Sequence, residues 1–493
     1  MKLSISPTLE VLKTLAKNYA YLPVYASFHA DTETPVSVFR RFEEGSKNCF
    51  LLDSVDGGER WARYSFLAKD PLAVISSKNS LTTVKYRNGE TEKIKGSPVE
   101  AVKEFMNRFK APVIEELPRL YGGAVGCFSY DVIRYYEKLK NSPPDELNLP
   151  DLSFMIADEM VVFDHLKQKL ILIVNIPSDG NLELEYIKAK ERLLILYNLI
   201  KRPHFQTENK NEGFVLGEVK SNFEREKYKE AVEKAKKHIF DGDIFQIVLS
   251  QRFTTAVPPS LFDVYRALRI TNPSPYMFYI KFEDFTLAGA SPELLLRCEN
   301  GILETCPIAG TRRRGETPEE DAALEKELLA DEKEKSEHIM LVDLGRNDLG
   351  KVSQFGSVKV SEFMNIVRFS KVMHISSTVN GILKKGLSPF DALMSVFPAG
   401  TLSGAPKVRA MELIDKFEPT KRGIYGGAIG YMSFDGNLDS CITIRTILFK
   451  DGKAHIQAGA GIVADSNPDK EYEECVSKAG AMLNAIGEAG SIL

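Results

Sequence analysis

Residues 424–463 read IYGGAIGYMSFDGNLDSCITIRTILFKDGKAHIQAGAGIV. Two Asp-Gly pairs, Asp435-Gly436 and Asp451-Gly452, divide this stretch into three segments rich in apolar residues. Asp-Gly between such segments is a strong signal for a two-residue hairpin turn. The stretch therefore predicts three antiparallel strands, and antiparallel hairpins of this kind favour an α+β fold.

The two turns also predict which residues face each other. If they centre near 436 and 451.5, Arg445 lies opposite about position 427 on one side and about position 458 on the other. Tyr425, Arg445 and the tripeptide Gly459-Ala460-Gly461 then fall on neighbouring rungs. Tyr and Arg donors beside a backbone with small side chains suit a carboxylate. An exposed arginine on a sheet face is the alternative interpretation.

Similar turn signals recur along the chain. Asn88-Gly89 and Asn300-Gly301 predict further hairpins, and Gly310 and Thr311 are expected in the loop just past the strand that follows Gly301. We expect large, mainly antiparallel sheets packed face to face with helices outside. Helices are predicted over 98–110, 182–200 and 223–243, the last opened by a Ser221/Glu224 capping box, and 201–213 is predicted to be the main linker.

One sequence pattern occurs twice. YGGAVGCFSYD at 121–131 closely echoes YGGAIGYMSFD at 425–435. Paired glycines inside strands indicate close backbone approach or bulges. The echo predicts two related sheet edges in one core, although a single echo does not establish duplication.

Composition narrows the possible function. The 493 residues carry a net charge of −4, which gives no electrostatic reason to expect nucleic acid as a partner. The six cysteines show no C-x-x-C spacing, so we expect no zinc site, and we interpret them as buried thiols in a reducing compartment. Because the sequence has no apolar run of about 18 residues and no signal-peptide pattern, we expect a cytoplasmic protein without membrane contact.

Carboxylates gather in two predicted helices. Glu334 and Glu337 are three residues apart in one, and Glu471, Glu474 and Lys478 repeat that spacing in another, which follows Asn467-Pro468. Two helices that each offer carboxylates could hold Mg²⁺, which takes few protein oxygens. Two solvated acidic faces are the alternative.

Three further residues have ordinary structural explanations. His374 lies in an apolar strand, where a histidine can be structural. Ser291-Pro292-Glu293 is a good helix start, so Glu293 needs no catalytic role. Thr401 and Ser403 precede a helix and could simply cap it.

Taken together, the motifs resemble the chorismate-utilising enzymes, and within that family the anthranilate synthase component I branch. The matching stretches run in order from about residue 223 to 480 and include GDIFQIVLSQRF, NPSPYMFYI, ASPELLLR, PIAGTRRRG, VMHISSTVNG, FPAGTLSGAPKVRAMELI and AGAGIVADSNP. LLDS at 51–54 with RYSFLA extends the likeness to the N-terminal part. The resemblance implies an N-terminal region (1–205) with an inhibitor site, intertwined with a chorismate-binding catalytic region (223–485).

The resemblance also implies a reaction: a Mg²⁺-dependent lyase adds ammonia to C2 of chorismate, expels the 4-hydroxyl and eliminates pyruvate to give anthranilate, the first step toward tryptophan. By position, it implies that Glu337 and Glu474 bind the metal, with Glu334 and Glu471 beside them. The substrate-binding residues implied are Gly310, Thr311, Tyr425, Arg445, Gly459, Ala460, Gly461 and Lys478. Glu293 is then the acid at the 4-oxygen, His374 the base for the C2 proton, and Thr401 positions substrate.

The nucleophile distinguishes the branches of the family. Many aminodeoxychorismate synthases carry a lysine where Ala309 stands, and isochorismate and salicylate synthases carry one where Gln246 stands. Neither position here offers an amine, so the resemblance implies free ammonia, supplied by a separate glutamine amidotransferase subunit. An aminodeoxychorismate synthase component I that lacks this lysine remains an alternative, as does a non-catalytic tryptophan-binding relative.

Feedback inhibition by tryptophan is a further implication of the resemblance. Ser54, Pro275, Tyr276 and Met277 match the family's tryptophan site, and Asp53 stands where a glutamate is common. Strand packing and an ordinary proline turn are the structural alternatives for these residues.

Overall fold

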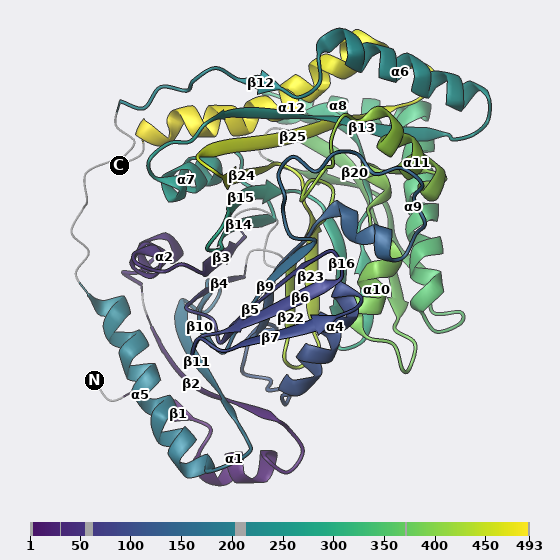
Figure 1. Ribbon diagram of the computed structural model, residues 1–493. Coiled ribbons are helices and arrows are strands. Elements are labelled where there is room, and N and C mark those ends of the chain that lie inside the picture. The colour runs from purple at the N-terminus through teal and green to yellow at the C-terminus, as the bar shows by residue number, and fades with distance from the viewer. Residues whose placement is uncertain (1–2, 30, 55–62, 203–212, 370–371, 492–493) are drawn as a thin grey trace.

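A computed structural model describes residues 3–491 except 30, 55–62, 203–212 and 370–371. Within these residues nearly all strands belong to two large antiparallel sheets with helices outside them, as expected (Figure 1). The first sheet has the order β1 (Ile5–Ser6), β2 (Tyr21–His29), β11 (Lys169–Pro177), β10 (Glu159–Asp164), β4 (Tyr64–Lys69), β3 (Cys49–Asp53), β14 (Tyr276–Lys281), β15 (Thr286–Ser291), β24 (Thr446–Lys450), β25 (Lys453–Ile462), β13 (Gln246–Ala256) and β12 (Lys220–Ser221), with β21 (Gly404–Ala405) also on β13.

The second sheet has the order β18 (Ile308–Arg313), β20 (Val372–Ile382), β17 (Ile302–Thr305), β16 (Leu294–Glu299), β23 (Leu438–Ile442), β22 (Ala428–Ser433), β8 (Gly123–Phe128), β9 (Leu152–Ala157), β5 (Ala73–Lys78), β6 (Leu81–Tyr86) and β7 (Thr91–Lys95), with β19 (Lys359–Arg368) on β20. The α-helices are α1 (Leu9–Leu15), α2 (Pro35–Glu43), α4 (Pro98–Met106), α5 (Leu182–Lys201), α6 (Arg225–Phe240), α7 (Leu261–Thr271), α8 (Pro318–Ala330), α9 (Glu332–Val352), α10 (Pro389–Val396), α11 (Lys407–Phe417) and α12 (Pro468–Glu488). Short 3-10 turns occupy Asn107–Phe109, Tyr130–Tyr135, Gly400–Leu402 and Ala489–Ser491.

The main core lies between the two sheets. Phe66 of the first sheet packs on Tyr431 of the second with ring centroids 5.9 Å apart, and one buried apolar cluster includes residues of both sheets. A second cluster joins the other face of the first sheet to α2, α5, α7 and α12. The sheets are thus held together by apolar side chains that water cannot reach, the main favourable term in folding.

Each sheet contains strands from both ends of the chain, which confirms that the N-terminal and C-terminal regions are intertwined. In the first sheet β3 pairs with β14, and in the second β8 pairs with β22. The bounds 1–205 and 223–485 of the two regions stay a prediction, and most of the linker predicted over 201–213 lies outside the described residues.

The echoed motifs form neighbouring strands, β8 and β22, in the middle of the second sheet. Gly126 of the first copy faces Gly430 of the second across the pair. A Cβ on Gly126 would lie 1.9 Å from the carbonyl oxygen of Ser153, and one on Gly430 would lie 2.2 Å from that of Asp439. Each position therefore requires glycine, because β9 beside β8 and β23 beside β22 approach too closely for a side chain.

The three-strand prediction for residues 424–463 is wrong in two respects. At the first turn Ala428 lies opposite Ile442, whereas the predicted register places it opposite position 444. The second Asp-Gly turn has the predicted register, with Ile447 opposite Ile456. Residues 438–450, however, form two strands: β23 ends at Ile442 in the second sheet, and β24 begins at Thr446 in the first. Arg445 lies at this crossing with φ +51°, a left-handed conformation that regular strands do not use.

Local capping predictions also fail. Glu224, and not Ser221, is the N-cap of α6, and no side chain caps that helix; Ser221 instead donates its hydroxyl to the carbonyl of Phe223 and to Gln251. The Ser403 hydroxyl donates to the Ala399 carbonyl, so it does not cap α11. In both cases the serine hydroxyl forms a hydrogen bond with a backbone carbonyl in the loop before the helix and does not cap the helix.

Strand and loop assignments need two further corrections. No helix follows Ser291: residues 292–293 connect β15 to β16, and the Ser291 hydroxyl donates to the Ile442 carbonyl. Gly310 and Thr311 lie inside β18, at an irregularity between Ala309 and Arg312, and not in a loop. Cys306 is half-buried, whereas the other five cysteines are buried.

Candidate active site

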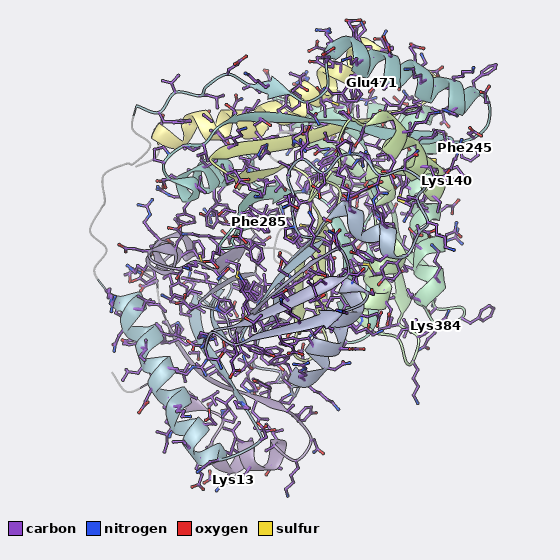
Figure 2. All side chains as sticks on the ribbon, in the orientation of Figure 1. Lys13, Lys140, Phe245, Phe285, Lys384 and Glu471 are labelled. Carbon is purple, nitrogen blue, oxygen red and sulfur yellow. The ribbon has the colours of Figure 1, made fainter. Side chains whose placement is uncertain are left out.

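The four glutamates come from two helices whose charged side chains lie close enough to interact electrostatically. Glu334 and Glu337 project from α9, and Glu471 and Glu474 from α12; Figure 2 labels Glu471 near α6. Burial raises the pKa of Glu337, and the nearby negative charges of Glu334 and Glu474 raise it further. The structure thus brings together carboxylates more than 130 positions apart in the sequence.

This arrangement fits a divalent cation by the chemistry of its donors. The described residues contain no group of three or more side chains already spaced as a metal cage. Mg²⁺ needs only one or two protein carboxylates, however, because water and substrate oxygens complete its shell. Neighbouring carboxylates repel each other when they are ionised, and a bound cation relieves this repulsion. The crowded glutamates therefore suit such a site.

Tyr425, Arg445 and the Gly459–Gly461 backbone lie beside these glutamates. The Arg445 guanidinium is buried enough to lower its pKa, while the nearby Tyr425 and Glu474 oppose that shift. A Cβ on Gly459 would lie 2.8 Å from the Tyr425 hydroxyl. Lys478 donates to the Gly459 carbonyl at 3.0 Å and pairs with Glu474 at 2.6 Å. The rungs predicted from the two turns are therefore neighbours, although Tyr425 precedes β22 and Arg445 lies between strands.

His374 and the β18 irregularity form another wall. Because a carbonyl oxygen only accepts, the 2.8 Å contact of His374 Nδ1 with the Gly310 carbonyl places the proton on Nδ1 and leaves Nε2 as an acceptor. The Thr311 hydroxyl oxygen lies 3.1 Å from the same nitrogen. Burial lowers the pKa of His374, and the positive charges of Arg445 and Lys478 lower it further. The ring is thus neutral near pH 7.

The side chains of Glu293 and Thr401 contact each other. The Thr401 hydroxyl donates to Glu293 Oε1 at 3.0 Å, so it does not cap α11. Glu293 is only 9% exposed, and burial raises its pKa to about 8. At neutral pH the carboxyl is therefore protonated and able to act as an acid.

Gln246 and Ala309, where other branches of the resembling family carry a lysine, lie next to residues of this site. The Gln246 amide donates to Glu337 Oε1 at 3.2 Å, and a Cβ on Gly461 would lie 2.9 Å from the same amide nitrogen. Ala309, on β18, is buried next to Gly310. Gln246 therefore contacts a candidate metal ligand.

The residues matched to an inhibitor site also gather, away from the glutamates. Asp53 of β3 pairs with Met277 of β14, so Ser54 follows one strand where Tyr276 begins the other. The Asp53 carboxylate accepts from the Ser54 amide, the Ser65 hydroxyl and Arg269. Among the described residues the buried Ser54 hydroxyl has no hydrogen-bond partner.

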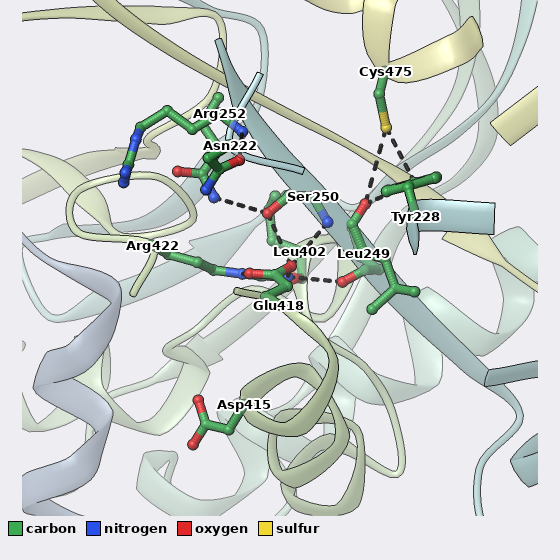
Figure 3. Close-up of polar contacts among 12 residues, drawn as sticks. Asn222, Tyr228, Leu249, Ser250, Arg252, Leu402, Asp415, Glu418, Arg422 and Cys475 are labelled. Atoms are coloured by element: carbon green, nitrogen blue, oxygen red, sulfur yellow. Dashed lines mark hydrogen bonds and ion pairs between the residues drawn. The ribbon is translucent and has the colours of Figure 1, made fainter. Parts of the chain in front are cut away.

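Sequence reasoning missed a buried ion pair that supports the site (Figure 3). The Arg422 guanidinium donates to Glu418 and to the carbonyls of Leu402 and Val248, and it lies over the Tyr425 ring at 5.6 Å. Glu418 also accepts from the Ser250 amide and hydroxyl. The only sequence signal was the i, i+4 spacing of Glu and Arg in FEPTKRG.

Within the described part of the chain, no helix is both long and apolar enough to cross a bilayer. A family model described as chorismate binding enzyme matches residues 47–484. Anthranilate synthase component 1 of Acetivibrio thermocellus is 56% identical to the chain, with 99% of each covered. Its Aquifex aeolicus counterpart is 43% identical, with 98% of each covered. The crystal structure of anthranilate synthase component I from Streptococcus pneumoniae TIGR4 aligns with TM-score 0.78 and 39% identity, over 92% of this chain and 98% of that one.

Proposed function

The chain belongs to the chorismate binding enzyme family, and we propose that it is an anthranilate synthase component I, a lyase that converts chorismate and ammonia to anthranilate and pyruvate. One observation carries this proposal: carboxylates from two acidic helices lie near an arginine and a tyrosine, and neither position 246 nor position 309 carries a lysine. A substrate with two carboxylates suits a cation-binding end and a guanidinium end.

Glu337 and Glu474 would hold Mg²⁺, with Glu334 and Glu471 beside them. When bound, the ion supplies a positive charge that binds and orients the ring carboxylate of the substrate. The second carboxylate, on the enolpyruvyl group, would bind Arg445, Tyr425 and the backbone of Gly459–Gly461.

Two steps then need proton transfer. Ammonia forms the N–C2 bond while the C4–O bond breaks, and the protonated Glu293 gives its proton to the departing oxygen, so water leaves. His374 Nε2 next removes the C2 proton, the C3–O ether bond breaks, and the departing enolpyruvate takes a proton at its methylene carbon to become pyruvate. The tautomer fixed by Gly310 presents Nε2 as the acceptor that this step requires.

Ammonia is the proposed nucleophile because Gln246 and Ala309 provide no amine. We propose that a glutamine amidotransferase subunit, the component II implied by the relatives' name, supplies it. The chain is also proposed to bind tryptophan at Ser54 and Pro275–Met277, where the Ser54 hydroxyl, which has no partner among the described residues, offers a contact for a ligand. Free thiols at all six cysteines suit a reducing compartment, and we place the protein in the cytoplasm.

The test is a partner-free assay with chorismate, ammonium and Mg²⁺, followed by identification of the products. We expect anthranilate fluorescence and one pyruvate per chorismate consumed. An amino product that keeps its enolpyruvyl group would show an aminodeoxychorismate synthase instead, and tryptophan binding without turnover would show a non-catalytic relative.

A further inference from the structure

A cavity lies beside Glu293, between β16 and the helices α9 and α10. It leaves about 50 Å³ for the centres of water molecules. One water needs roughly 10–15 Å³ in this measure, so the cavity has room for several. Nothing in the reaction proposed above uses this space.

The walls of the cavity are apolar and its polar groups are few. The wall includes Leu294, Leu341, Leu344, Val396, Ala399 and Ile442. Glu293 and Thr401 line it at one place, and Asp348 lines it at another. Leu341, Leu344 and Asp348 continue the face of α9 that starts with Glu337, because they follow it at helical spacing.

Asp348 connects the cavity to the outside. Its carboxylate is 5% exposed and accepts from Lys407 at 2.7 Å and from Lys351 at 3.0 Å. The Lys407 side chain is largely buried, but that of Lys351 is 62% exposed. One of the two cations at this carboxylate therefore reaches solvent.

We propose that this cavity is a water-filled passage that serves Glu293 and that ends on the solvent side at Asp348; the inference rests on the proposed function. In each turnover Glu293 gives one proton to the 4-oxygen, and the water so formed can leave through the cavity. The Glu293 carboxylate then takes a proton from a cavity water. That water regains one along the chain of waters, which reaches bulk solvent beside Asp348 and the exposed Lys351, while the ammonium group formed at C2 releases a proton.

The need for such a passage follows from burial. Glu293 hardly contacts solvent, and the bound substrate would cover its other side, so direct exchange with bulk water is blocked. A buried acid that acts once per turnover must nevertheless be reprotonated once per turnover. Thr401 holds Oε1, which leaves Oε2 to carry the exchanging proton.

The first experiment fills the passage. Leu344→Phe adds volume at the cavity wall, and Ile339→Phe makes the same kind of change on the same helix at a residue that is 44% exposed. In the partner-free assay we expect Leu344→Phe to lower kcat at least fivefold, to change the KM for chorismate less than twofold and to raise the solvent deuterium isotope effect on kcat. Ile339→Phe should match the wild type.

The second experiment removes the charges at the solvent-side end of the passage without leaving a buried charge unpaired. Asp348→Asn combined with Lys407→Met neutralises both partners, because removing only one is expected to destabilise the fold. We expect the same signature as for Leu344→Phe, with an unfolding midpoint close to that of the wild type. A kcat within twofold of the wild type in both variants would overturn the proposal.

A third measurement does not depend on turnover. A high-resolution crystal structure should show ordered waters from Glu293 toward Asp348, and a dry cavity would overturn the passage. If the wild type makes no anthranilate at all, the proposed function fails; if it does and the waters are absent, only the passage fails.

Discussion

Replacing Arg422 by methionine removes a buried guanidinium that holds together several parts of the site. Arg422 is 3% exposed, and the change leaves the Glu418 carboxylate buried with no cation. Breaking one side of a buried pair costs about 3–5 kcal/mol. An unfolding entropy of about 2.1 cal/mol/K per residue gives about 1 kcal/mol/K for 493 residues, so we expect Tm to fall by about 3–5 °C.

Differential scanning calorimetry measures this shift. Arg409→Met is the matched control, since Arg409 makes ion pairs but is 40% exposed, and such pairs contribute about 0–1 kcal/mol. Combining Arg422→Met with Glu418→Gln should restore part of the loss, because no buried charge then remains unpaired. Equal Tm values for the Arg422 and Arg409 variants would refute the reasoning.

Three further outcomes are expected. Burial raises the pKa of Glu293 from 4.5 to about 8, so between these pH values the folded chain keeps a proton that the unfolded chain loses. The unfolding free energy of the wild type, compared with that of Glu293→Gln, should therefore fall as pH rises from about 5 to 8. Urea titrations at several pH values can check this. Glu474→Gln should abolish Mg²⁺-dependent turnover at unchanged Tm, and wild-type rates across a Mg²⁺ titration would remove Glu474 from the metal shell. Gly459→Ala places a methyl group 2.8 Å from the Tyr425 hydroxyl and should raise the KM for chorismate at least tenfold in steady-state assays, whereas an unchanged KM would separate this backbone from the substrate.

Hairpins could be predicted from sequence because their signals are local. Asn300-Gly301 and Asp451-Gly452 form two-residue turns, and Asn88-Gly89 lies in a three-residue loop of the expected hairpin. A two-residue turn is determined by the φ values that its own residues tolerate, so little tertiary information is needed. The helix start predicted at Ser291-Pro292-Glu293 failed for the opposite reason. Ser-Pro-Glu is a good local start for a helix, but Ser291 ends β15 and Leu294 begins β16, so pairing within the sheets keeps the segment extended.

The crossing at Arg445 was not predictable from the pattern. A left-handed arginine is locally unfavourable, and it is held by tertiary contacts that the sequence does not display. Helical spacing predicted that each glutamate pair shares a face, yet nothing local indicates that α9 and α12 meet. That expectation came from the family resemblance. Arg422 and Asp348 were missed because their burial depends on segments distant in sequence. Arg422 donates to the carbonyls of Leu402 and Val248, and Asp348 accepts from Lys407.

Interleaving of early and late strands has a consequence during synthesis. Strand β8 ends at Phe128, but its partner β22 begins only at Ala428. At about 5–20 residues per second, the ribosome needs roughly 15–60 s to make the intervening segment. Throughout that time the nascent chain exposes an open, apolar strand edge of the kind that other chains can pair with. Newly made copies should therefore depend on chaperones, or on slow translation at low concentration, until the C-terminal strands emerge.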